Sequence, residues 1–100
     1  MLMTEELEKI IPAMYSNENT KLEDKTVYAK FFTPDSNWTW FILEFDGEDT
    51  LFAMVDGHEK ELGNVSLSEL ESVRGPLGLK VERDLHFTPK RYGDIEELKC

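Results

Sequence analysis

Residues 38–45 read WTWFILEF, and this stretch decides the fold. Aromatic and branched aliphatic residues favour a strand, in which successive side chains point to opposite faces. One face of the strand would carry Trp38, Trp40, Ile42 and Glu44, and the other Thr39, Phe41, Leu43 and Phe45. Because both faces are largely apolar, we expect a central strand of a sheet that is covered on both sides.

Turn signals on either side of this strand predict an antiparallel meander. A Pro-Asp-Ser-Asn turn precedes the strand, and Asp-Gly pairs at 46–47 and 56–57 supply the positive φ angles that tight hairpins need. The last predicted strand of the meander is short and charged, which is typical of a sheet edge. The predicted strands span residues 26–32, 38–45, 50–55 and 58–62.

Helices are predicted before and after the meander. Thr4 can cap a helix over residues 4–11, which ends at Pro12 because proline removes a helical hydrogen bond. Ser66 and Glu69 form a capping box, the usual start of a helix, and a Gly-Pro pair ends this second helix a few residues later.

The end of the chain adds a strand over residues 79–87 and a short helical turn over residues 94–98. The 100 residues contain no internal linker, so we expect a single domain over residues 1–100. The predicted fold class is α+β: a mostly antiparallel sheet of four or five strands with short helices packed on it.

Charge is the first guide to function. Eleven Lys and Arg residues face twenty-one Asp and Glu residues, which gives a formal net charge of −10. Nucleic acids and anionic membranes are bound through clusters of cations, and the sequence has no such cluster. An acidic surface suits a protein partner with a basic surface, although it also serves plain solubility.

Cysteine content and hydropathy indicate a cytoplasmic protein. Cys100 is the only cysteine, so neither a disulfide framework nor a cysteine-based metal cage can form within the chain. Residues 1–15 contain several charges and do not resemble a signal peptide, and no apolar run reaches the length of a membrane span.

A partner-binding surface is one candidate site. If helices leave part of the central strand uncovered, Trp38 and Trp40 would remain available to a partner or to a second copy of the chain. Alternatively, the helices near both ends of the chain cover these rings. Acidic residues at the two Asp-Gly turns extend the candidate surface: Glu48, Asp49, Glu59 and Glu61.

The other candidate residues lie on the predicted last strand or, in the case of Arg74, in the segment before it. Glu82, Asp84 and His86 alternate on one face and could ligate a metal, or they form an ordinary solvated face. Arg83 lies on the apolar face and either binds a ligand or forms a structural ion pair. Arg74 likewise either binds a ligand or anchors the loop. No set of residues forms a recognisable catalytic motif, so we predict no catalytic residues and no cofactor.

Several stretches together resemble the bacterial family known as domain of unknown function 2958 (DUF2958), over nearly the whole chain. The sequence departs from the family pattern at Asn64, where the family tends to have an aromatic residue. The resemblance implies an intracellular protein often carried by plasmids, phages and integrative elements, and it implies no activity. The matching stretches are residues 30–34, 38–46, 61–70, 74–79 and 82–87.

Three functional hypotheses follow. The first is a protein-binding module of a mobile genetic element, acting as an inhibitor of restriction or CRISPR-type defence by occupying a basic surface of a host protein. The second is a metal- or small-ligand-binding, enzyme-like domain that uses Glu82, Asp84 and His86. The third is a homodimeric accessory subunit. We favour the first and predict that the protein is not an enzyme.

Overall fold

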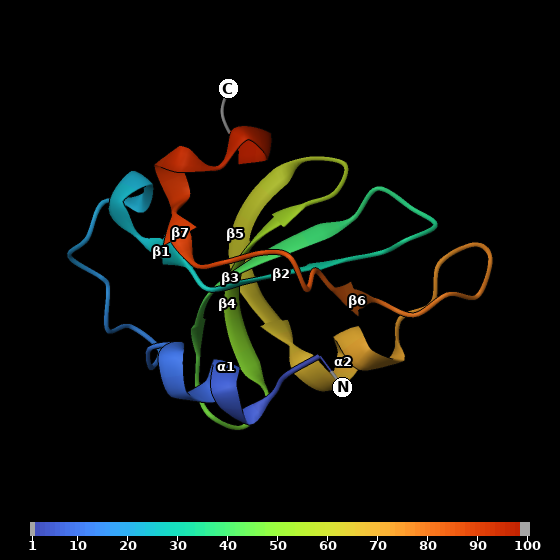
Figure 1. Cartoon of the computed structure of the whole chain (residues 1–100), viewed down its shortest axis with the longest axis horizontal. Coiled ribbons are helices and arrows are strands. Elements are labelled where there is room, and N and C mark those ends of the chain that lie inside the picture. Colours follow the sequence, from blue (N-terminus) through green and yellow to red (C-terminus); the bar gives the residue numbers. More distant parts are fainter. Residues whose placement is uncertain (1, 99–100) are drawn as a thin grey trace.

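The computed structural model describes residues 2–98 (Figure 1). Its main feature is a five-stranded antiparallel sheet with the strand order β5-β4-β3-β2-β6. A two-stranded sheet pairs β1 with β7. The strands are β1 (Thr26–Val27), β2 (Ala29–Phe32), β3 (Thr39–Phe45), β4 (Thr50–Asp56), β5 (Lys60–Ser66), β6 (Glu82–Arg83) and β7 (Lys90–Arg91).

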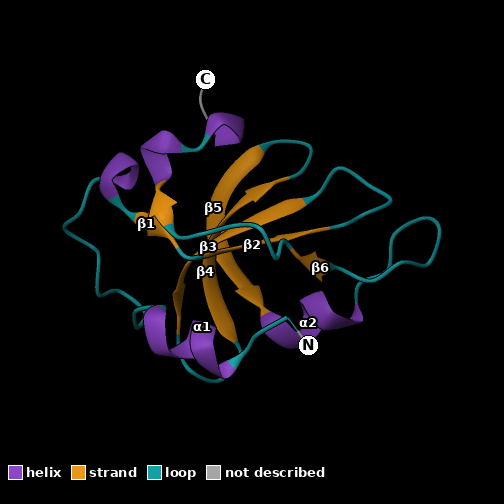
Figure 2. Ribbon diagram, in the orientation of Figure 1, coloured by secondary structure: helices purple, strands orange, loops and turns teal. Residues whose placement is uncertain are grey.

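Short helical elements lie on both sides of the sheet. Figure 2 shows α1 and α2 below the strands and the C-terminal turns above them. The α-helices are α1 (Glu5–Ile10) and α2 (Leu67–Ser72), and the 3-10 turns are η1 (Leu22–Asp24), η2 (Tyr92–Asp94) and η3 (Glu96–Leu98). The predicted α+β class and the mostly antiparallel sheet are therefore confirmed.

The meander from β2 to β5 has the predicted order, and β3 is its central strand. Two hydrophobic clusters cover the opposite faces of β3, because its side chains alternate between them. One cluster packs α1 and α2 against residues such as Trp40 and Ile42. The other packs the C-terminal turns against Phe41 and Leu43. The prediction of a strand covered on both faces is confirmed.

Both helix starts also follow the prediction. The Thr4 hydroxyl accepts a hydrogen bond from the Leu7 amide at 3.2 Å, and the Ser66 hydroxyl accepts one from the Glu69 amide at 3.3 Å. Each bond satisfies one of the amide groups that the first turn of a helix leaves without a partner. Side-chain caps therefore set both boundaries.

The prediction of one strand over residues 79–87 is wrong. Only Glu82 and Arg83 pair with β2, and the chain turns directly afterwards. The Asp84 carboxylate accepts a hydrogen bond from the His86 amide at 2.9 Å, an arrangement in which Asp favours a turn over a strand. Leu85 is consequently 74% exposed, so the predicted apolar face does not form.

Two other strands differ from the prediction by more than one residue. The stretch 26–32 divides at Tyr28, because Thr26 and Val27 pair with β7 rather than with β3. Strand β5 is longer than predicted, since it pairs with β4 through Gly63 and Asn64 as far as Ser66. Pairing with a long, well-formed neighbour thus overrides the weak strand preference of Gly and Asn.

Candidate binding sites on the two sides of strand β5

A β-bulge in the central strand directs Glu44 into the structure. Ile42 pairs with Ala53, whereas Glu44 pairs with Phe52, so Leu43 is the extra residue of the bulge. A bulge shifts the alternation of side chains by one position. Glu44 therefore lies on the face of Phe52, and not on the face of Ile42 as predicted. The Glu44 side chain is buried there, with the residue only 3% exposed.

The Glu44 carboxylate is held by the loop that follows α1. Its Oε1 atom accepts a hydrogen bond from the Tyr15 amide at 2.9 Å, and its Oε2 atom accepts one from the Asn17 amide at 3.3 Å. Tyr15 has a φ angle of 66°, in the left-handed region that costs a non-glycine residue about 1–2 kcal/mol. The bonds to Glu44 offset this strain and fix the carboxylate in place.

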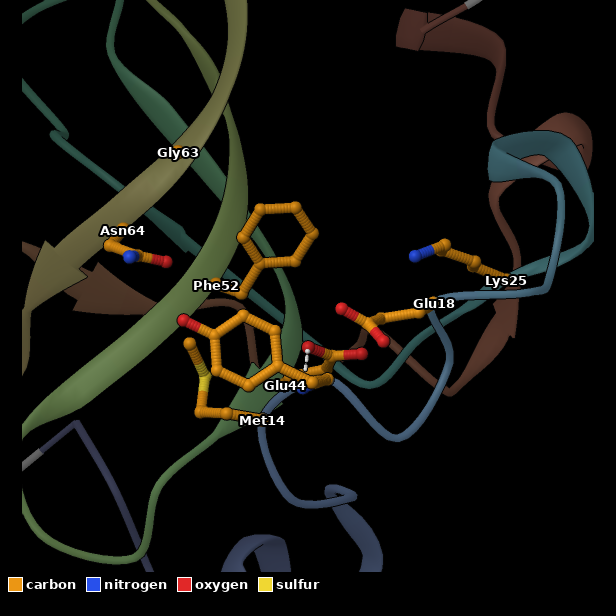
Figure 3. Close-up of a pocket in the computed structure, with 8 residues that line it drawn as sticks. Met14, Glu18, Lys25, Glu44, Phe52, Gly63 and Asn64 are labelled. Atoms are coloured by element: carbon orange, nitrogen blue, oxygen red, sulfur yellow. Dashed lines mark hydrogen bonds between the residues drawn. The ribbon is translucent and has the colours of Figure 1, made fainter.

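A pocket of about 470 Å³ opens beside this carboxylate and is called the Glu44 pocket. In Figure 3 the side chains of Glu18 and Lys25 point toward Glu44 and the ring of Phe52. The Lys25 ammonium lies 5.6 Å from the centroid of the Phe52 ring, within the range of a cation–π interaction. The lining residues are Met14, Tyr15, Glu18, Lys25, Glu44, Phe52, Gly63 and Asn64.

This combination of groups is suited to an organic cation. Carboxylates accept hydrogen bonds from ammonium or guanidinium groups, and an aromatic face attracts the same cations. In the structure the cation beside Phe52 is supplied by the chain itself, as Lys25.

The opposite face of the sheet carries a second hollow, called here the tryptophan groove. It consists of two adjoining parts, of about 460 and 340 Å³, and both are lined by Trp40 and Val73. The first part is also lined by Thr50, Asn64, Val65, Ser66, Glu69 and Leu70, and the second by Thr33, Ser36, Trp38, Arg74, Gly75 and Pro76.

The two predicted tryptophans lie together in this groove. Their rings are stacked with centroids 6.2 Å apart, and His58 meets the Trp38 ring edge-on at 5.5 Å. Trp40 is only 7% exposed and belongs to the core, so of the two alternatives for these rings the covered one holds for Trp40. Trp38 is half-buried and is the ring of the pair that a partner can reach more readily.

The four predicted acidic residues do not form one patch. Glu48 and Asp49 lie in the turn before β4. Glu59 and Glu61 lie at the opposite end of β4, which has seven residues: Glu59 is in the turn after β4, and Glu61 is in β5 and pairs with Val55. Asp49 is also engaged within the domain, because its carboxylate accepts hydrogen bonds from the Ser66 hydroxyl and, at 2.8 Å, from the Ser68 amide. These bonds lower the pKa of Asp49, with the Ser66 bond as the largest cause.

The two predicted arginines have different surroundings. Arg74 donates hydrogen bonds to the carbonyl oxygens of Glu71 and Val73, at 3.0 and 2.9 Å, and so anchors the chain at the end of α2. Arg83 is half-buried in β6, and its Nε atom has no hydrogen-bond partner among residues 2–98. The ion pair, one of the two alternatives for Arg83, does not form within the described part of the chain.

Glu82, Asp84 and His86 do not share one strand face, whether as metal ligands or as a solvated face, because the strand ends at Arg83. Asp84 instead lies 3.9 Å from the Lys30 ammonium, and its carboxylate holds the turn described above. Over residues 2–98, no group of three or more His, Cys, Asp or Glu side chains is placed to hold a metal ion.

No sequence pattern predicts the Glu44 pocket. Its residues come from the loop after α1, from the region around η1 and from three neighbouring strands, so their spacing along the chain carries no motif. One signal was available: Glu44 is a charged residue inside an apolar strand, and buried carboxylates require hydrogen-bond donors from elsewhere in the fold.

The fold and these two hollows define a small α+β domain with ligand-sized pockets on both sides of a sheet edge. The chain belongs to the family described as "Protein of unknown function (DUF2958)", whose model matches residues 1–92. No curated protein and no solved structure matches it significantly. Among residues 2–98, no helix is long and apolar enough to cross a membrane.

Proposed function

We propose that this domain binds a protein partner with a basic surface, and that the Glu44 pocket receives a lysine or arginine side chain of that partner. The observation that carries the proposal is a buried carboxylate, fixed by two backbone amides, next to an aromatic ring that already attracts a cation. Such a pre-organised anion binds a cation without the cost of ordering it first.

The overall charge supports the same type of partner. A net charge of −10 attracts a basic protein over a distance and increases the rate at which the two meet. An arginine suits the Glu44 pocket better than a lysine, because its planar guanidinium can bond to a carboxylate and stack on Phe52 at once. The partner side chain would displace the Lys25 ammonium from the Phe52 ring.

Binding, not catalysis, is the proposed activity, and it needs no cofactor. We place the domain in the cytoplasm, where it would act by occupying a basic surface, such as the nucleic-acid groove of a restriction or CRISPR-type defence enzyme. This finer proposal rests on the charge and on the family resemblance to proteins of mobile elements. Bacteria that express the domain should lose protection against phage; unchanged protection would disprove an anti-defence role.

The pocket itself is tested with a defined probe, an acetylated nonapeptide that alternates valine and arginine. We expect Glu44→Gln to weaken binding by about tenfold, because a charge-assisted bond is replaced by a neutral one. The matched control is Glu8→Gln, which changes the net charge equally on the exposed side of α1. Isothermal titration at physiological salt measures both variants.

The two variants distinguish pocket binding from general attraction. If Glu8→Gln weakens binding as much as Glu44→Gln does, the peptide binds through overall charge and the pocket proposal is wrong. Circular dichroism verifies that Glu44→Gln remains folded, which is expected since the amide oxygen of glutamine still accepts one backbone hydrogen bond.

A further inference from the structure

Strand β5 has a free edge of seven residues. It is the first strand in the order of the main sheet and pairs, among the described residues, with β4 alone. Free edges present N–H and C=O groups that can pair with another chain, and natural proteins usually shorten or cover them. This edge is long, and all seven of its residues are exposed or half-buried.

The hydrogen bonds at the two ends of the hairpin determine which backbone groups point outward. The Gly57 amide donates to the Glu59 carbonyl at 3.2 Å, and the Leu67 amide donates to the Asp49 carbonyl at 2.7 Å. In an antiparallel ladder, hydrogen-bonded and non-hydrogen-bonded residue pairs alternate along the strands. The pairing of β4 with β5 runs without a bulge from one of these hydrogen bonds to the other. Gly63 and Val65 therefore bond to β4, whereas Leu62 and Asn64 direct N–H and C=O to the free edge.

Asn64 lines both the Glu44 pocket and the tryptophan groove. Its side chain lies on the face of its pairing neighbour Phe52, which is also the face of the Glu44 pocket. In an antiparallel pair, directly opposed residues share a face and the residues on either side point the other way. A strand added to β5 would thus direct the residue opposite Asn64 toward Glu44 and its two neighbours toward the tryptophan groove.

Gly63 gives an independent reason to expect another backbone here. A Cβ atom at this position would meet nothing within 4 Å, and the residue does not have a positive φ angle. Neither a turn nor packing within the chain therefore requires glycine. Glycine inside a strand often marks a place where another backbone approaches closely.

We propose that the basic partner adds an extended segment to β5 as an antiparallel strand. A basic residue opposite Asn64 enters the Glu44 pocket, and the apolar residues on either side of it enter the tryptophan groove. This mode rests on the proposed function, and it specifies a segment in which basic and apolar residues alternate. Main-chain hydrogen bonds supply affinity in such β-augmentation, and the alternating pockets supply specificity.

A second copy of the chain fits this edge less well. Each chain has a net charge of −10, so two copies repel one another. Strand β5 itself reads KELGNVS, with a single lysine at one end, and does not offer the alternating pattern that the two hollows require.

The test uses the same valine–arginine nonapeptide in two backbone-methylated forms. In the proposed pairing the arginine N–H groups point to β5 and the valine N–H groups point away from it. Methylation of the arginine amide nitrogens should weaken binding by about tenfold or more, whereas methylation of the valine amide nitrogens should change it by less than about threefold. Equal effects of the two methylations would overturn the proposal.

Two measurements on the protein complete the test. Peptide binding should slow amide hydrogen exchange at Leu62 and Asn64 and leave Gly63 and Val65 nearly unchanged, because only the first pair gains partners. Asn64→Pro should bind about tenfold more weakly than Asn64→Ala, since proline removes the outward N–H and is tolerated at an edge.

The outcomes separate this inference from the proposed function. If binding depends on Glu44 but the Leu62 and Asn64 amides exchange as before, the pocket proposal stands and strand addition is wrong. If sedimentation shows that the free protein is a dimer whose Leu62 and Asn64 amides are already protected, a second copy occupies the edge and the inference is overturned.

Discussion

Glu44 is the residue that connects the fold to the site. It lies in the central strand, yet its carboxylate bonds to the amides of Tyr15 and Asn17, in the loop that follows α1. The β-bulge makes this connection, since without the extra residue Glu44 would lie on the face covered by the helices. A single local irregularity thus both buries an acid and shapes the pocket around it.

The contribution of this carboxylate to folding can be measured directly. We expect Glu44→Ala to lower the free energy of unfolding by about 1–3 kcal/mol, because the variant leaves two amides without their charged acceptor. Glu18→Ala is the matched control: Glu18 also lines the pocket but is exposed, and its loss should change stability by less than about 0.5 kcal/mol. Urea denaturation measures both values, and equal losses would contradict the assigned role of Glu44.

The elements that the sequence predicted well are those with strong local signals. The apolar run of β3, the Asp-Gly turns and the hydroxyl caps of α1 and α2 depend on neighbouring residues, so they can be read from the sequence. The same holds for the family resemblance, which the match over residues 1–92 confirms.

The predictions that were wrong, and the elements that were missed, concern segments whose structure depends on partners far away in the chain. Residues 79–87 alternate like a strand, but β2 provides pairing for Glu82 and Arg83 alone. Strand β7 exists because it meets β1, a partner more than sixty residues away, as the pairing of Val27 with Lys90 shows. The bulge that directs Glu44 inward is likewise a property of the β3–β4 register, which no pattern within β3 encodes.

At the scale of the whole molecule, the acidic residues divide into two kinds. Some remain exposed and contribute to the field that would attract a basic partner, as Glu59 and Glu61 do at the start of β5. Others are used within the fold, as Glu44 and Asp49 are. The acidic residues behind the net charge of −10 therefore do not form a single binding patch. Different carboxylates stabilise the fold and would attract a partner.

This division predicts how stability depends on pH. Hydrogen bonds from Ser66 and Ser68 lower the pKa of Asp49 below its ordinary value of 3.8. An acid with a lowered pKa in the folded state stabilises the fold above its ordinary pKa, and this stabilisation is lost as the pH falls through the lower value. Acidification below about pH 3.8 should therefore reduce the melting temperature of the protein.

Asp49→Asn isolates this effect. The variant should melt at a lower temperature than the original protein at about pH 7, and the difference should shrink as the pH falls below about 3.8, because a protonated Asp49 resembles asparagine. Glu48→Gln is the control, because it removes one charge from the same turn and the Glu48 carboxylate forms no hydrogen bond within residues 2–98. A pH-independent difference for Asp49→Asn, measured by circular dichroism, would mean that the Asp49 charge does not contribute to the link between the β3–β4 turn and the start of α2.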